Sequence, residues 1–151
     1  MGDTKSRAIA SLVLGSIAAE QGDVVEALKR YQEALEIFQA LQDQRNIADT
    51  LNDTGELFMN LGAYDLAKEK LIQSVRIAEC IGDTFLAAAN YNALGKLSEA
   101  QGDFTSAKLW FAKALSMSEA IGNKENAAIS QRNLERVTAL EAAQHQKEES
   151  T

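Results

Sequence analysis

Few residues of this chain have side chains of the kinds that catalyse reactions or bind metals. His145 is the only histidine and lies in a polar C-terminal stretch, where a solvated side chain is expected. Cys80 is the only cysteine, and no histidine near it in sequence would activate it as a nucleophile. Asp49 and Asp53 are one helical turn apart, but the chain has 22 acidic residues, so such pairs arise by chance. The sequence therefore predicts no catalytic residue, no metal site and no cofactor.

The composition indicates a helical domain that folds without metals or disulfides. Hydrophobic residues make up 46% of the 151 residues, which suffices for a core, and the sequence contains no proline. Proline breaks helices, whereas Ala, Leu, Glu and Gln, which are abundant here, favour them. We therefore expect helix along nearly the whole length and no strands.

The charge and hydropathy of the chain argue against two classes of partner. A net charge of −7 repels the phosphates of nucleic acids, and no cluster of Lys and Arg offsets it. The longest apolar stretches, such as 85–89, are too short to cross a bilayer, and the polar start is not a signal peptide. We expect no nucleic-acid or membrane partner and a cytoplasmic protein. A single cysteine agrees with a reducing compartment.

A repeat of 40 residues organises the sequence. Small, large and aliphatic residues recur at this spacing in three successive units. Within each unit the apolar positions fall three and four residues apart, which predicts a pair of helices rather than strands. The recurring positions include Gly15, Gly55 and Gly95; Gly22, Gly62 and Gly102; Ala27, Ala67 and Ala107; and Tyr31, Leu71 and Phe111.

The glycines and aspartates of each unit have predictable structural roles. A helix interior disfavours glycine, so Gly15 and its equivalents are expected where the two helices of a hairpin pack closely. Gly22 and its equivalents are expected to end the first helix in a left-handed conformation. Asp23 and Asp103 follow these glycines and can cap the next helix. Ala63 stands at the equivalent position of the middle unit, so that helix should start less well capped.

Two glycines seven residues apart, followed on the second helix by alanine, an aromatic residue and alanine, resemble the tetratricopeptide repeat. The likeness covers residues 1 to about 121. It is similar in particular to the 40-residue form found in Pins/LGN-type adaptors, kinesin light chains and bacterial regulators. The resemblance implies an all-α, right-handed superhelical solenoid of three helical hairpins. Two features differ from the family: no proline ends the second helix, and the asparagine pair of the Pins/LGN first helix is missing.

The repeat also sets the expected boundaries. Past the third unit the apolar pattern restarts, but no second helix follows, so a single capping helix and then a flexible polar tail are expected. The first residues align with a later boundary between units, which favours a chain that begins at a repeat boundary. The predicted ranges are 1–143 for a single domain, about 4–41, 44–81 and 84–121 for its repeats, about 124–143 for the capping helix and 144–151 for the tail.

In this family the first helices line a concave groove, and the resemblance implies that side chains around the first glycine of each unit project into it. These positions are largely apolar in the first unit, acidic in the second and basic toward the capping helix. We expect a peptide or partner segment to bind here, with Lys or Arg opposite Asp53 and Glu56. The predicted peptide-binding residues are Leu12, Ser16, Asp49, Asn52, Asp53, Glu56, Met59, Asn92, Lys96, Glu99, Arg132 and Arg136.

Chaperone-binding members of the family hold a partner's C-terminal carboxylate with a set of Lys, Asn, Asn, Lys and Arg. None of the corresponding residues here matches that set, so the tails of Hsp70 and Hsp90 are not expected to bind. These corresponding residues are Leu12, Ser16, Asp53, Ala89 and Ala93.

The expected function is a non-catalytic protein-interaction scaffold. Two alternatives stay open. The first is a structural protein that forms a homo-oligomer through the exposed apolar face of its first helix, which includes Ile9 and Val13. The second is a peptide-sensing regulatory module.

Overall fold

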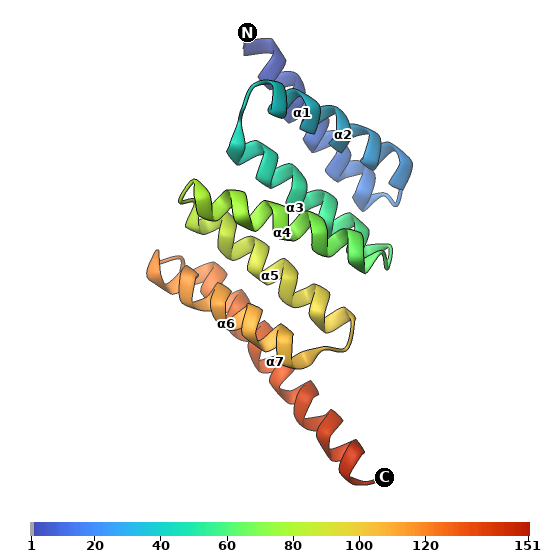
Figure 1. Cartoon of the computed structure of the whole chain (residues 1–151), viewed down its shortest axis with the longest axis vertical. Coiled ribbons are helices and arrows are strands. Elements are labelled where there is room, and N and C mark those ends of the chain that lie inside the picture. Colours follow the sequence, from blue (N-terminus) through green and yellow to red (C-terminus); the bar gives the residue numbers. More distant parts are fainter. Residues whose placement is uncertain (1) are drawn as a thin grey trace. The chain divides into compact units, whose positions relative to one another are not determined.

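The computed structural model describes residues 2–151, and within that range the chain forms seven α-helices joined by short turns, with no strand (Figure 1). The predicted all-α fold of helical hairpins is confirmed. Met1, which falls inside the predicted domain, lies outside the described residues. The helices divide into two compact units, Met1–Gly82 and Asp83–Thr151, and each is described by itself. The right-handed superhelix and the single domain stay predictions.

Unit 1 holds four helices that form two antiparallel hairpins. Helix α1 packs on α2, and α3 packs on α4. Helix α3 also packs against α2 and touches α1, which joins the two hairpins into one body (Figure 1). The helices are α1 (Gly2–Glu20), α2 (Val24–Ala40), α3 (Gln44–Asn60) and α4 (Tyr64–Cys80).

The core of unit 1 follows the helical period of its apolar residues. Ala8 of α1, Phe38 of α2 and Leu51 of α3 are buried in one cluster. In the second hairpin, the Ser74 hydroxyl of α4 donates a hydrogen bond to the carbonyl of Ala48 in α3. The small residues at these positions let the helix backbones approach, as the repeat predicts.

Unit 2 consists of a third hairpin and one additional helix. Helices α5 (Thr84–Ala100) and α6 (Phe104–Ala120) pack on each other, and α7 (Lys124–Glu149) packs on α6. Phe111 of α6 and Val137 of α7 are fully buried in one hydrophobic cluster. The additional helix therefore covers the apolar side of the third hairpin, as a capping helix does.

Two aromatic rings stack within the third hairpin. The ring centroids of Tyr91 in α5 and Trp110 in α6 are 5.6 Å apart, with 21° between the ring planes. The ammonium group of Lys113 lies 4.4 Å from the centre of the Tyr91 ring. This arrangement ties the two helices together and stabilises the cation against an aromatic face.

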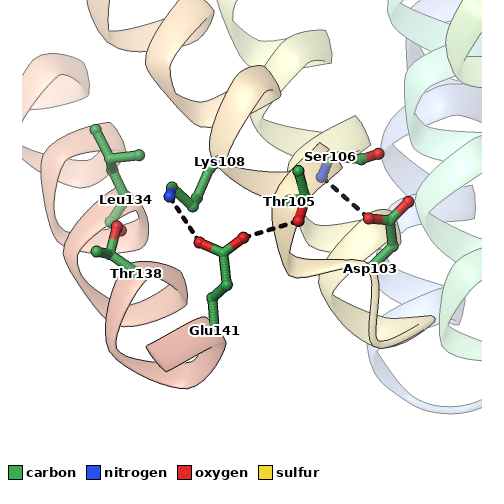
Figure 2. Close-up of polar contacts among 7 residues, drawn as sticks. All are labelled: Asp103, Thr105, Ser106, Lys108, Leu134, Thr138 and Glu141. Carbon is green, nitrogen blue, oxygen red and sulfur yellow. Dashed lines mark hydrogen bonds and ion pairs between the residues drawn. The ribbon is translucent and has the colours of Figure 1, made fainter. Parts of the chain in front are cut away.

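Helix α7 is longer than predicted. It runs to Glu149, whereas the sequence placed its end near residue 143. Figure 2 shows Glu141 reaching back to α6, where its carboxylate accepts hydrogen bonds from Thr105 Oγ1 at 2.7 Å and Lys108 Nζ at 2.6 Å. These bonds hold α7 against α6 near residue 143, where the helix was predicted to end. No glycine or proline follows that residue to end the helix. The flexibility of the tail stays a prediction.

The predicted caps are confirmed. Asp23 and Asp103 each accept a hydrogen bond from the backbone N–H three residues on, at 3.1 and 3.0 Å. Ala63 makes no such bond at the start of α4. Gly22 and its equivalents have φ angles of 76° to 79°, the left-handed conformation that favours glycine.

The mid-helix glycines also lie where the repeat predicted. A Cβ added to Gly95 in α5 would come within 2.5 Å of the Phe111 ring in α6. At Gly55 the nearest atoms are those of the Leu71 side chain, 2.8 Å away. Glycine is therefore required at these positions because a large side chain of the partner helix fills the space.

Candidate functional site

Unit 1 contains an acidic pocket between α1 and α3. Its volume is about 340 Å³. Three of the predicted binding residues, Ser16, Asp53 and Glu56, line it together. We call this the acidic pocket; its lining residues are Ser16, Ala19, Glu20, Tyr31, Asp53, Glu56, Leu57 and Asn60.

The repeat's glycine positions one wall of the acidic pocket. A Cβ on Gly15 would lie 2.6 Å from the Tyr31 ring, so only glycine leaves the ring its place beside α1. The ring extends from α2 past Gly15, and its hydroxyl reaches Ser16 Oγ at 3.4 Å. The local sequence Gly-Ser on α1 thus brings a phenol and a hydroxyl to the same point of the pocket.

Asp53 is poorly supplied with hydrogen-bond donors. Ser16 Oγ lies 3.5 Å from Asp53 Oδ2 and only 3.1 Å from the carbonyl oxygen of Leu12. Because the serine hydroxyl has one proton, it donates to one of these acceptors at a time, and the shorter contact is the carbonyl. No basic side chain among residues 2–151 forms an ion pair with Asp53.

The shortage of hydrogen-bond donors and basic partners affects the pKa values of the groups in the acidic pocket. Burial and the negative charges of Asp49 and Glu56 raise the pKa of Asp53, the Ser16 hydrogen bond lowers it, and the net pKa is about 7. Burial also raises the pKa of Tyr31, and the charges of Asp53, Glu56 and Glu20 act in the same direction. A cation in the pocket would offset the repulsion among these carboxylates and favour the charged form of Asp53.

The other predicted residues of unit 1 are placed differently. Leu12 and Asn52 are each only 8% exposed. Leu12 packs in the hydrophobic core beside α2, which leaves little of its side chain open to a peptide, and its role in binding stays a prediction. Asp49 and Met59 are half-buried on α3, and Asp49 acts on the acidic pocket through its charge.

Three of the predicted residues of unit 2, Asn92, Glu99 and Arg136, are held by partners within the unit. Asn92 and Ser130 exchange hydrogen bonds at 3.0 and 3.1 Å, which joins α5 to α7. Arg136 makes a bidentate ion pair with Glu99, at 2.8 and 2.7 Å, and also donates to Asn133. The expected basic end is therefore weaker than predicted, because the Arg136 charge is compensated within unit 2.

Lys96 and Arg132 are the predicted basic residues that stay open to solvent. Both are exposed, and neither makes a hydrogen bond or ion pair within the part of the chain that the structure describes. Five residues that line the acidic pocket were not among the predicted binding residues: Ala19, Glu20, Tyr31, Leu57 and Asn60. Tyr31 could have been found, because it recurs at the position that meets the mid-helix glycine.

The remaining chemistry-bearing residues form no site. His145 and Cys80 are exposed, 65 residues apart in the sequence. Among the described residues no three His, Cys, Asp or Glu side chains are placed to hold a metal ion. In the same range, every helix is too short or too polar to cross a membrane.

Comparison with known proteins finds solved structures with a similar fold. No curated protein matches the sequence. The structure is similar to the N-terminal domain of stress-induced protein-1 (STI-1) from C. elegans, with a TM-score of 0.64 and 21% identity over 86% of this chain and 96% of that one. It is also similar to BtubC (BKLC) from P. vanneervenii, with a TM-score of 0.65 and 16% identity over 89% of this chain and 64% of that one. At these identities the likeness concerns the fold alone.

Sequence profiles point to the same family as the hairpins do. Two profiles described as tetratricopeptide repeat match the chain, one over residues 6–80 and one over residues 88–121. The matched ranges contain the paired glycines and the helical hairpins built around them. This chain belongs to the tetratricopeptide repeat family.

Proposed function

We propose that this protein is a non-catalytic scaffold that captures a Lys or Arg side chain of a partner's peptide segment in the acidic pocket. Tetratricopeptide repeats support a protein-interaction scaffold, and protein partners follow from the family. The observation that carries the finer proposal is Asp53, a largely buried carboxyl group without a basic partner. A buried charge is costly unless it is paired, so a cation from outside has a free-energy reason to bind here.

The shape and lining of the acidic pocket suit a long basic side chain. Ala19 and Leu57 supply apolar surface for the methylene groups, and Glu20 and Glu56 supply further negative charge around the head group. The Asn60 side chain adds a polar group at the wall. A peptide running across α1 and α3 would place one Lys or Arg in the pocket and its neighbours along the predicted groove.

The proposal is tested by NMR titration of the ¹⁵N-labelled protein with a short acetylated peptide, Ala-Leu-Lys-Ala-Leu amide. We expect shift changes at Ser16, Asp53 and Glu56, and none of that size with the same peptide carrying acetyl-lysine. Replacing Asp53→Asn together with Glu56→Gln should abolish the response, because the charge that holds the cation is gone.

A matched control keeps the change in total charge the same. Glu33→Gln with Glu36→Gln removes two carboxylates at the same spacing from α2, away from the acidic pocket. This control should respond like the unaltered protein. Equal responses of the two double variants, or equal responses to both peptides, would show that the acidic pocket is not the binding site.

A peptide-sensing regulatory module would use the same pocket and stays an alternative proposal. The cytoplasmic location also stays a proposal, and so does the expected failure to bind Hsp70 and Hsp90 tails. The identity of the bound segment tests the first and the last of these, whereas the location is tested by cell fractionation.

A further inference from the structure

Helix α1 carries an exposed apolar stripe on the side that faces away from the core of unit 1. The opposite side of the helix is buried in that core. Side chains four residues apart lie on one face of a helix, so the stripe is continuous. A cluster of large exposed apolar side chains usually marks an interaction surface. The stripe consists of Ile9, Val13, Leu14 and Ile17, which are 43%, 53%, 46% and 44% exposed.

Two residues of the stripe occupy positions that another first helix uses for packing, whereas Ile9 and Val13 correspond to the half-buried Asp49 and Asp53 of α3. One repeat further along the chain, Leu14 and Ile17 correspond to Thr54 and Leu57 of α3. Leu57 is only 5% exposed and Thr54 is half-buried, because α3 packs there against the preceding hairpin. The same positions of α1 are therefore shaped to receive a helix.

The charges at the two ends of α1 determine which helix fits. Asp3, Lys5 and Arg7 precede the stripe, so that end of α1 carries more positive than negative charge, and Glu20 follows the stripe. The Lys5 side chain is 54% exposed even though it pairs with Asp43, and neither Arg7 nor Glu20 has an ion pair in the described range. A second α1 running in the opposite direction brings the basic end of each helix beside the acidic end of the other. A parallel copy would bring like charges together.

The order of apolar residues in the stripe also suits an antiparallel pair, because it is symmetric about Val13. Ile9 and Ile17 lie four residues before and after Val13. In an antiparallel pair centred on Val13, each Ile9 meets the Ile17 of the other copy, and the two Val13 side chains meet at the centre. An interface in which the same patch serves both partners closes after two copies and forms no filament.

We propose that two copies of this chain associate through α1, with the two helices antiparallel about a two-fold axis near Val13. The observations that carry this proposal are the exposed stripe, its symmetric order and the opposite charges at its ends. Of the residues that line the acidic pocket only Glu20 enters this proposal, and the proposal does not require a peptide to bind there.

Disulfide cross-linking tests both the pairing and its direction. The exposed Cys80 is first replaced, Cys80→Ser, and single cysteines are then introduced as Ile9→Cys, Val13→Cys or Ile17→Cys. Under mild oxidation at low micromolar concentration, we expect Val13→Cys to cross-link with itself. Ile9→Cys should cross-link with Ile17→Cys when the two are mixed, but neither alone. Self-cross-linking of all three would indicate a parallel pair and overturn the proposal, as would cross-linking of none.

Sedimentation equilibrium provides a second measurement. We expect the unaltered protein to be dimeric, and Val13→Asp with Ile17→Asp to raise the dissociation constant at least about tenfold, since charges at an interface centre are strongly unfavourable. Val25→Asp is the matched control, because Val25 is 80% exposed on α2, and this variant should stay dimeric. Circular dichroism verifies that the variants fold. A monomeric unaltered protein at all concentrations would mean that a different partner covers the stripe, and the proposal would be wrong.

Discussion

At the scale of single residues, the charge state of Asp53 affects the stability of the fold. Its pKa of about 7 in the folded chain lies well above the ordinary value of 3.8. The unfolded chain therefore loses this proton at lower pH than the folded one does. The stabilising contribution of the protonated form is fully present below pH 4 and is lost as the pH rises through 7.

Replacing Asp53→Asn should remove this pH dependence. We expect the unaltered protein to lose stability as the pH rises from about 4 to about 7, and the variant to be more stable at pH 8 by roughly 1–3 kcal/mol, since one pKa unit corresponds to about 1.4 kcal/mol and partial exposure of Asp53 reduces the effect. Urea unfolding across this pH range measures the difference. Glu36→Gln on the exposed side of α2 serves as the control and should follow the unaltered protein. Parallel curves for Asp53→Asn and the unaltered protein would show that Asp53 titrates normally.

At the scale of helices, the start of α4 differs from those of its neighbours. The backbone at Ala63 has φ and ψ angles of −83° and 67°, close to those of the capping aspartate Asp83, at −83° and 86°. Only the side-chain acceptor is missing. The backbone at Ala63 is thus already arranged for a cap that the sequence does not supply.

Supplying this acceptor should stabilise the middle hairpin. Ala63→Asp is expected to raise the free energy of unfolding by about 0.5–2 kcal/mol, because an N-cap bond satisfies a free N–H group of the first turn. Asp23→Ala, the reverse change at the start of α2, should lower it by a similar amount. Thermal and urea unfolding measure both. If Ala63→Asp proves neutral while Asp23→Ala destabilises, the first turn of α4 obtains its stability from contacts other than a cap.

The sequence predicted the helices well because their boundaries are local. The caps, the turn glycines and the mid-helix glycines each depend on residues within a few positions or one repeat of each other. The predicted end of α7 was wrong, since the helix runs on to Glu149. Near the predicted end, Glu141 bonds to residues of α6 that lie more than 30 positions earlier in the sequence. A contact of that kind leaves no periodic signal in one sequence.

The candidate site was predicted in part. Asp53 and Glu56 were predicted from the resemblance to the tetratricopeptide repeat, whose first helices line a groove, and both line the acidic pocket. The burial of Leu12 depends on how deeply α1 settles on α2, which the spacing of apolar residues does not specify. The pairing of Glu99 with Arg136 depends on two flexible side chains 37 residues apart. The sequence therefore predicts which residues are candidates for binding, and the packing of the helices determines which of these side chains stay accessible to a partner.

At the scale of the whole molecule, the net charge of −7 should influence how fast a basic partner arrives. An acidic protein attracts a cationic peptide over distances of about the Debye length, which is ~10 Å at 0.1 M salt and shorter at higher salt. The attraction acts before any contact forms. It therefore affects the association rate more than the dissociation rate.

Raising the salt from 50 to 500 mM should slow association with a lysine-bearing peptide about tenfold or more, since screening removes the long-range attraction. Stopped-flow mixing with a fluorescently labelled Ala-Leu-Lys-Ala-Leu peptide measures the rate. The acetyl-lysine peptide, which carries no charge, is the control and should show little salt dependence. Rates that do not change with salt for the charged peptide would exclude electrostatic attraction as the cause of binding.

The stacked pair of Tyr91 and Trp110 has an optical consequence. Trp110 is the only tryptophan in the chain, so all indole emission comes from the α5/α6 hairpin. Helices α1 to α4 contain no such fluorophore, whereas circular dichroism records every helix alike. Comparing the two signals during denaturation reports whether unit 1 and unit 2 melt together or in succession, without any label on the protein.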